Sequence, residues 1–285
     1  MMLVLNPRSG KGHAMREGAT AERIAAEMGI RLDIRTIERP GHGKELAQEA
    51  VATGMERVIS AGGDGTLNSV AAGLLHTKVP VGVVALGSGN GYARSLGLPL
   101  DPEQAFRRAF TGEAAQMDVC FLNDIPFLGT AGIGFDARVA HRFDRSKSRG
   151  MLGYARIIVE EIFGAKPMRV VVKANHETKE THVLMVVLCN TREFGNGAEI
   201  SPGSLPDDGI AELRIVRKPS FFPLIRAFIQ IYTGRADNSP YITNVPTRTA
   251  TIWQEGTLAH LDGEPVEVGH EVIFRLEPKR LWVVR

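Results

Sequence analysis

The sequence of 285 residues has only two cysteines, Cys120 and Cys189, and they lie far apart without a Cys-x-x-Cys spacing. A disulfide framework or a cysteine zinc site is therefore not expected, and the compartment predicted is reducing and cytoplasmic. The eight histidines show no HxxxH or HExxH pattern, so a zinc protease is not expected either. Residues 1–5 are too short for a signal peptide, and no apolar run approaches membrane-spanning length.

An excess of positive or negative charge is also nearly absent. Lysine and arginine total 34 and aspartate and glutamate total 32, which leaves a net charge of +2. Without an arginine-rich arm, this balance gives no reason to expect a nucleic-acid partner. The GxSxG elbow of serine hydrolases and the GxxxxGK[ST] spacing of Walker A loops are both missing.

What is present is an alternation of strand and helix patterns over the first 118 residues. This pattern predicts an α/β domain with a Rossmann-like parallel sheet at 1–118. Residues 119–285 carry short strand patterns separated by turns, which predict a mostly antiparallel β-sandwich, with the last strand an open candidate to return to the first domain. Within these halves we predict strands at 3–5, 31–37, 58–61, 81–86, 168–173, 182–189, 210–216, 249–253, 258–261 and 272–276, and helices at 14–28, 45–53, 67–75, 102–110 and 153–163.

The glycine-rich turn at 61–68, Ala-Gly-Gly-Asp-Gly-Thr-Leu-Asn, is the most informative stretch. It follows a buried strand pattern and precedes a helix pattern. Glycines let backbone N–H groups approach phosphate oxygens, and a helix N-terminus favours the same anion. Because Asp64 would repel a bare phosphate, its presence indicates a metal ion or a proton-accepting role.

Two further glycine-rich turns follow predicted strands. The first is Asn6-Pro7-Arg8-Ser9-Gly10-Lys11-Gly12, and the second, at 87–91, is Gly-Ser-Gly-Asn-Gly. Each turn alone is also compatible with an ordinary strand-to-helix connection. Since the carboxyl ends of parallel strands meet at one sheet edge, three such turns together predict a nucleotide site there.

Carboxylates form the next group of candidates. Asp262-Gly263 is typical of a type I′ hairpin, and Asp207-Asp208-Gly209 has the same ordinary interpretation. Adjacent acids beside a glycine also bind hard cations through carboxylate and carbonyl oxygens. Asp136 lies in an apolar setting, where an unpaired carboxylate is costly, so we expect it to meet a partner.

The apolar run at 221–232, Phe-Phe-Pro-Leu-Ile-Arg-Ala-Phe-Ile-Gln-Ile-Tyr, has two interpretations. A core-facing helix is the more common fate of such a stripe. The alternative is a surface segment that dips into the headgroup layer of a membrane.

The motifs together resemble one family. The glycine turns named above, the Gly-Ile-Gly-Phe-Asp stretch at 132–136, the turn at 201–209 and Leu-Asp-Gly-Glu at 261–264 occur in the order seen in bacterial diacylglycerol kinase-like lipid kinases. These enzymes are related to sphingosine and ceramide kinases. The resemblance covers essentially the whole chain and implies an ATP-binding first domain and a lipid-binding β-sandwich.

The resemblance also implies roles for particular residues. It implies ATP contacts from Asn6, Pro7, Arg8, Ser9, Gly10, Lys11, Thr36, Gly62, Gly63, Asp64, Gly65, Thr66, Leu67, Asn68 and Ser88. Asp64, Asp118, Asp207 and Asp208 would organise Mg²⁺, and a further magnesium would bind Asp208 and the carbonyls of Leu205 and Ile210. Glu264, assisted by Asp262, would accept a proton, and Asp64 completes the catalytic set. Asp136 and Arg94 are the lipid-contact candidates.

The implied activity is transfer of the γ-phosphoryl group of ATP to a hydroxyl of a membrane lipid, either diacylglycerol or a sphingoid-like lipid. Gly91 stands where many bacterial diacylglycerol kinases carry aspartate, and this form is closer to sphingosine kinases. Two alternatives stay open: a NAD kinase-type phosphotransferase, and a non-catalytic lipid-binding regulator. The partner expected is a lipid at a membrane surface, contacted peripherally, with a homodimer left open.

Overall fold

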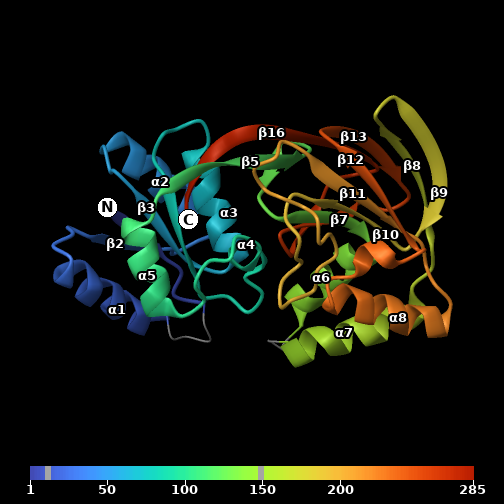
Figure 1. Ribbon diagram of the computed structural model, residues 1–285, viewed down its shortest axis with the longest axis horizontal. Helices are drawn as coiled ribbons and strands as arrows, with labels where there is room; N and C mark the ends of the chain where they lie inside the picture. Colours follow the sequence, from blue (N-terminus) through green and yellow to red (C-terminus); the bar gives the residue numbers. More distant parts are fainter. Residues whose placement is uncertain (10–13, 147–150) are drawn as a thin grey trace. The chain divides into compact units, whose positions relative to one another are not determined.

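The computed structural model describes residues 1–9, 14–146 and 151–285 (Figure 1). The chain folds as two compact units. The first comprises Met1–Met117 with Lys279–Arg285, and the second comprises Asp118–Pro278.

The first unit is built on a parallel sheet with the strand order β2-β1-β3-β4. At its β4 edge, Val283 at the end of the last strand, β16, pairs in parallel with Val81. The strands are β1 (Met2–Leu5), β2 (Asp33–Thr36), β3 (Val58–Gly62) and β4 (Val81–Ala85), and the helices are α1 (Ala14–Glu27), α2 (His42–Ala52), α3 (Asp64–Leu74), α4 (Gly91–Ser95) and α5 (Pro102–Thr111).

Successive side chains of the strands point to opposite faces of the sheet, so the core of the first unit has two parts. Leu3, Leu5 and Ile59 pack against α1 and α5, with Phe106 and Phe110 filling the space between. Helices α2 and α3 pack tightly on each other, because a Cβ on Gly73 would lie only 2.4 Å from the carbonyl oxygen of Lys44. The α5 helix starts as predicted, with the Asp101 carboxylate accepting a hydrogen bond from the Gln104 amide at 3.0 Å.

The second unit is a sandwich of antiparallel strands. One sheet has the order β12-β11-β10-β7-β14-β15, and the other contains β13, β8, β9 and the first part of β16, with β5 and β6 beside it. Their bounds are β5 (Ala114–Leu122), β6 (Ile125–Phe127), β7 (Thr130–Gly134), β8 (Met168–Ala174), β9 (Glu177–Val183), β10 (Met185–Cys189), β11 (Ala211–Val216), β12 (Ile242–Thr247), β13 (Thr249–Gln254), β14 (Leu258–Leu261), β15 (Glu264–Glu267) and β16 (Glu271–Val284).

Side chains from both sheets form one core between them, including Phe127, Phe274, Ile133 and Leu213. The predicted fold class, an α/β domain followed by a mostly antiparallel β-sandwich, is therefore confirmed. Helices α6 (Phe135–Arg145), α7 (Met151–Gly164) and α8 (Phe221–Tyr232) lie along the outer face of the sheet that contains β10, as Figure 1 shows. A short helix, η2 (Ala236–Asn238), follows α8.

Four predicted elements were wrong in detail. Helix α2, expected at 45–53, begins at His42. The strand expected at 182–189 is the end of β9 and the whole of β10, with Leu184 between them. Most of β9 carries exposed polar residues, so it has no apolar alternation to detect. The strand expected at 272–276 continues to Val284. Helix α3 begins at Asp64 rather than at Leu67, so the glycine-rich turn supplies its first residues.

Among the described residues, none of the helices combines the length and the apolar character needed to cross a membrane.

Candidate functional site

The carboxyl ends of the parallel strands bring the predicted nucleotide loops together in the first unit. Leu5 of β1 lies beside both Thr36 of β2 and Ala61 of β3 in the strand register. The Asn6 amide donates to the Ala61 carbonyl at 3.0 Å, and the Leu86 amide donates to the Gly62 carbonyl at 2.8 Å. The loops after β1, β3 and β4 thus leave the same sheet edge.

A side-chain hydrogen bond joins the first loop to the second. The Asn6 Nδ2 group donates to Thr66 Oγ1 at 2.8 Å, and Asn6 Oδ1 accepts from the Arg8 amide at 3.0 Å. Gly62 is required here, since a Cβ would lie 2.4 Å from Thr66 Oγ1. Leu67 is buried against the core, and its amide donates to the Gly63 carbonyl at 3.1 Å. Gly10 and Lys11 lie outside the described residues.

Asp64 joins the second loop to the third. Its carboxylate accepts hydrogen bonds from the amides of Gly91 and Tyr92 at 3.1 and 3.3 Å, which are the first residues of α4. The carboxylate therefore caps a helix N-terminus, where negative charge is favoured. Gly63 and Gly87 meet backbone to backbone, because a Cβ on Gly87 would lie 2.7 Å from the Cα of Gly63.

The third loop is shaped by Asn90 and Arg94. Asn90 has a left-handed backbone with φ of 55°, and its Nδ2 group donates to the Gly87 carbonyl at 2.9 Å. Arg94 folds back so that its Nε donates to the Gly89 carbonyl at 3.2 Å, which places this lipid-contact candidate on the loop of the first unit. Ser88 is exposed at the tip.

The edge has the features that a nucleoside triphosphate needs. Asn68 Oδ1 and Asn90 Oδ1 are buried acceptors without a hydrogen-bond partner among the described residues. Such oxygens suit an amino or hydroxyl donor of a base or ribose. These groups fit ATP as the nucleotide.

The predicted acidic cation site lies in the second unit. Asp118 is completely buried, and its Oδ2 accepts from the Gly209 amide at 2.6 Å while its own amide donates to the Pro206 carbonyl at 2.8 Å. Arg248 Nε donates to the Gly209 carbonyl at 2.7 Å. Asp118 and Arg248 therefore fix the turn that carries Asp207 and Asp208.

Within that turn, Asp208 is exposed and its Oδ1 accepts from the Ile210 amide at 3.0 Å. Leu205 and Ile210 also have exposed side chains. Over residues 1–9, 14–146 and 151–285, no three His, Cys, Asp or Glu side chains are placed to hold a metal ion. The predicted magnesium site draws two of its ligands from backbone carbonyls, and this oxygen-only set fits a hard cation.

The Asp262-Gly263 turn has the predicted type I′ form. Both residues have positive φ, 49° and 85°, and Leu261 pairs directly with Glu264 across the hairpin. The Asp262 carboxylate accepts three hydrogen bonds, from the amides of Leu128, Gly129 and Thr130, at 2.8 to 2.9 Å. Asp262 therefore holds the turn in place, while Glu264 is exposed beside it.

Replacing Asp262 by asparagine is expected to destabilise the second unit. The amide offers one oxygen to three N–H donors, and each buried donor left without an acceptor costs about 1–3 kcal/mol. Burial raises the pKa of Asp262 above its ordinary value, so the folded chain holds this proton to higher pH than the unfolded chain does. Its contribution to stability therefore falls as pH rises from the ordinary aspartate range through the folded pKa.

Urea denaturation of both proteins at several pH values measures this effect, and the loss caused by Asp262→Asn should shrink as pH rises through that window. Asp124→Asn is the matched control, because Asp124 is an exposed turn aspartate with its carboxylate on Arg275. Equal stabilities for Asp262→Asn and Asp124→Asn would contradict the structural role of Asp262.

Asp136 has the partner that its apolar setting requires. Its Oδ2 lies 3.1 Å from His260 Nε2, and both side chains are buried. His260 Nδ1 accepts from the Gly263 amide at 3.3 Å, so Nε2 carries the proton and donates to Asp136. Gly132 is required underneath, because a Cβ would lie 1.7 Å from Asp136 Oδ2. The histidine thus links Asp136 to the turn that carries Glu264.

Both units match models of known protein families. Residues 1–122 match the family model of the diacylglycerol kinase catalytic domain, and residues 129–285 match the YegS C-terminal NAD kinase beta sandwich-like domain. The chain belongs to the YegS family of lipid kinases.

Relatives of this kinase family cover nearly the whole chain. A protein of Chromohalobacter salexigens named "Probable lipid kinase YegS-like" is 30% identical over 92% of this chain and 86% of its own length. One of the same name from Enterobacter sp. is 27% identical over 94% of this chain and 90% of its own. The crystal structure of a diacylglycerol kinase from Bacillus anthracis str. Sterne has the same fold, with a TM-score of 0.80, 22% identity, and coverage of 99% of this chain and 96% of that one.

Sequence reasoning missed several site residues in this lipid kinase. His260 gives no signal in the sequence, because 124 residues separate it from Asp136. Asn190 and Thr191 were also missed. They follow β10 directly, beside Asp118 and the loop held by Asp262, and the buried atoms Asn190 Oδ1 and Thr191 Oγ1 have no partner among the described residues. The only signal was a pair of polar residues directly after an apolar strand.

Proposed function

We propose that this kinase transfers the γ-phosphoryl group of ATP to a hydroxyl of a membrane lipid, diacylglycerol or a sphingoid-like lipid. The supporting observation is that the loops after β1, β3 and β4 converge on one sheet edge in a chain of this family. We further propose that the protein acts in the cytoplasm and binds the membrane peripherally.

The first unit would bind the nucleotide. The amides at the start of α3 and the glycines after β3 and β4 face the phosphates, where backbone donors and a helix N-terminus favour negative charge. The N-cap residue of α3, Gly63, makes no side-chain hydrogen bond to the first turn of the helix. Asn68 Oδ1 and Asn90 Oδ1 would accept hydrogen bonds from the base or ribose.

The acids have separate proposed roles. Asp64, whose carboxylate accepts from the amides at the α4 N-terminus, would orient the nucleotide's cation, and Asp118, Asp207 and Asp208 are the further acidic groups proposed for Mg²⁺. When bound, Mg²⁺ would neutralise charge on the phosphates. A further magnesium would be held by Asp208 with the carbonyls of Leu205 and Ile210. Asp136 and Arg94 remain the proposed lipid contacts, although the structure directs Asp136 to His260.

Glu264 is the proposed proton acceptor. The lipid hydroxyl oxygen bonds to the γ-phosphorus as the bond to the β,γ-bridging oxygen breaks, and ADP departs. Glu264 takes the hydroxyl proton in the same step. Asp262 and the Asp136–His260 pair would position it by fixing the turn before it.

Incubation of the protein with ATP, Mg²⁺ and a total lipid extract, followed by mass spectrometry, tests this function. We expect products heavier by one phosphate, formed together with ADP. A parallel reaction with NAD in place of lipid addresses the NAD kinase alternative, which the match of the second domain to a NAD kinase beta sandwich-like domain supports. Phosphorylated NAD with unmodified lipid would overturn the proposal, and no ATP consumption with either acceptor would favour a non-catalytic lipid-binding protein.

A further inference from the structure

Helix α8 presents its apolar side to solvent. Phe222, Ile225 and Ile229 are 80%, 49% and 56% exposed, and their spacing places them on one face. Gln230 is buried instead, and Ile231 packs into the core below the helix. The more common expectation, a core-facing stripe, is therefore wrong for this face. A contiguous exposed apolar surface of this kind marks a site of interaction.

Helix α7 extends the same surface. Val159 and Phe163 are among its exposed large apolar residues, while Ile158 and Ile162 pack into the core cluster that also contains Ile231 of α8. The Lys218 ammonium donates to the Ala165 carbonyl at 2.6 Å, which ties the segment before α8 to the end of α7. Figure 1 shows the two helices next to each other. We call the exposed apolar residues of α7 and α8 the apolar patch.

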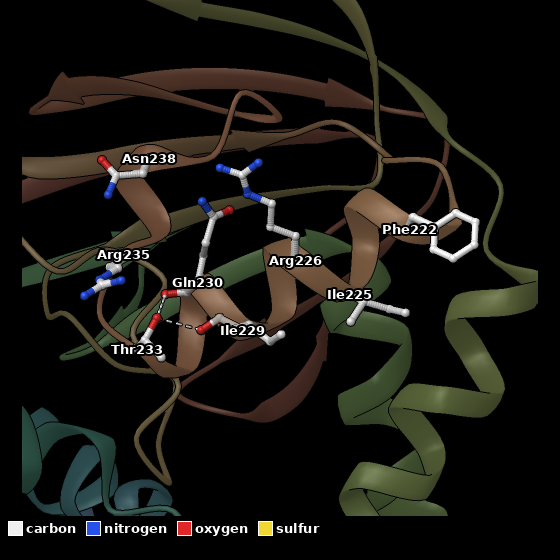
Figure 2. Close-up of a pocket in the computed structure, with 8 residues that line it drawn as sticks. All are labelled: Phe222, Ile225, Arg226, Ile229, Gln230, Thr233, Arg235 and Asn238. Carbon is white, nitrogen blue, oxygen red and sulfur yellow. Dashed lines mark hydrogen bonds between the residues drawn. The ribbon is translucent and has the colours of Figure 1, made fainter.

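The apolar patch borders a cationic groove of about 470 Å³ (Figure 2). Arg226 and Gln230 point to one side of α8, toward Asn238, while Ile225 and Ile229 point to the other. All acidic side chains of the chain lie in its described parts. None of them forms an ion pair there with Arg226 or Arg235. The groove is lined by Phe222, Ile225, Arg226, Ile229, Gln230, Thr233, Arg235 and Asn238.

Acidic groups on α7 and directly after α8 are paired, while Glu199 lies beside the end of α8, where its Oε2 would be 2.8 Å from a Cβ on Gly234. Residues 221–232 include no aspartate or glutamate. On α7, Glu160 pairs with Arg142 and Arg156, and Glu161 pairs with Arg142. After α8, Asp237 pairs with the buried Arg214. An apolar face with unpaired arginines beside it is the pattern of helices that lie in a membrane interface.

We propose that α8 docks this protein onto an anionic lipid bilayer. Phe222, Ile225 and Ile229 enter the acyl boundary, and Arg226 and Arg235 bind headgroup phosphates. The choice of a membrane as occupant rests on the proposed lipid kinase function. A second copy of the chain fits the surface less well, because a two-fold contact through α8 would bring the two unpaired cationic rims together.

Sedimentation of the full-length protein with sucrose-loaded vesicles tests the docking surface. Vesicles of phosphatidylcholine with phosphatidylglycerol should bind the protein, and pure phosphatidylcholine vesicles or high salt should weaken binding. The double variant Phe222→Asp/Ile225→Asp should bind at least about tenfold more weakly. Arg226→Glu/Arg235→Glu should remove the preference for phosphatidylglycerol.

Ile273→Asp is the matched control, because Ile273 is an equally exposed apolar residue on β16, away from α8. It should bind vesicles like the unmodified chain. Thermal denaturation reports whether the variants fold, and Phe222→Ser/Ile225→Ser replaces the aspartate variant if that one unfolds. Unchanged vesicle binding by a folded α8 variant would overturn the docking surface. The docking surface would also be overturned if the protein formed a dimer in solution, and the α8 variants were monomeric but still bound vesicles.

The binding assay contains no ATP, so it is independent of phosphoryl transfer. If the protein binds vesicles but phosphorylates no lipid, the proposed function fails and the docking surface stands. If detergent-dispersed lipid is phosphorylated but vesicles are not bound, the docking surface fails alone. The folded α8 variants should phosphorylate detergent-dispersed lipid at the unmodified rate, since α8 holds none of the proposed active-site residues.

Discussion

Replacing Asp64 by asparagine is expected to lower the turnover of lipid phosphorylation by about 10²–10³-fold. Asparagine keeps the shape of the side chain and one oxygen for the Gly91 and Tyr92 amides, but it removes the negative charge from the phosphate edge. The Mg²⁺ concentration that gives half-maximal rate should rise as well. Steady-state rates with detergent-dispersed lipid over a magnesium titration measure both effects.

A helix cap alone would give a different result. Loss of an N-cap costs about 1 kcal/mol of stability and leaves the chemistry intact. Asp101→Asn is the matched control, because Asp101 caps α5 through the Gln104 amide at 3.0 Å and lies outside the phosphate edge. If Asp64→Asn resembles Asp101→Asn in rate and magnesium dependence, the cation role of Asp64 is wrong and only the cap remains.

Replacing Glu264 by glutamine is expected to lower turnover by about 10²–10⁴-fold while ATP binding is retained. Glutamine has the same size but accepts no proton, and the proposed nucleotide contacts all lie in the first unit. Single-turnover rates and equilibrium titration with ATP separate the two quantities. Thermal denaturation should show little change, because Glu264 is exposed in a hairpin that Asp262 already holds.

Glu267→Gln is the control for this substitution. Glu267 is an exposed glutamate at the other end of the same four-residue strand, β15, and it pairs with Leu258 rather than with Leu261. It should keep the unmodified rate. Full turnover by Glu264→Gln would remove Glu264 from the mechanism, and a loss of ATP binding in this variant would show that its effect is not confined to proton transfer.

The loops of the first unit were predictable because their placement follows from strand direction. Apolar runs before Asn6, Gly62 and Gly87 indicated parallel strands, and the carboxyl ends of such strands share an edge. The type I′ turn was predictable for a similar reason. Asp262-Gly263 is a local signal, and a two-residue hairpin needs positive φ at both residues.

Contacts between residues far apart in sequence were not predictable from local patterns. Nothing in the spacing joins His260 to Asp136 or Asp64 to Gly91, because these pairs exist only after the strands and loops have packed. Strand β9 was missed for the opposite reason. It pairs with β8 through its backbone, while most of its side chains are polar and exposed, so it carries no hydrophobic period.

The sequence alone determined the two-part fold class, the sheet edge with its glycine loops and the kinase family, because these depend on hydrophobic periodicity and on short motifs. The tertiary structure decided which carboxylates are bound to backbone amides, which histidine holds the Glu264 turn, and which side of α8 faces solvent. A helix that is apolar almost all round has no unique buried face by pattern. Packing selects that face, and here it placed Gln230 inside and Phe222 outside.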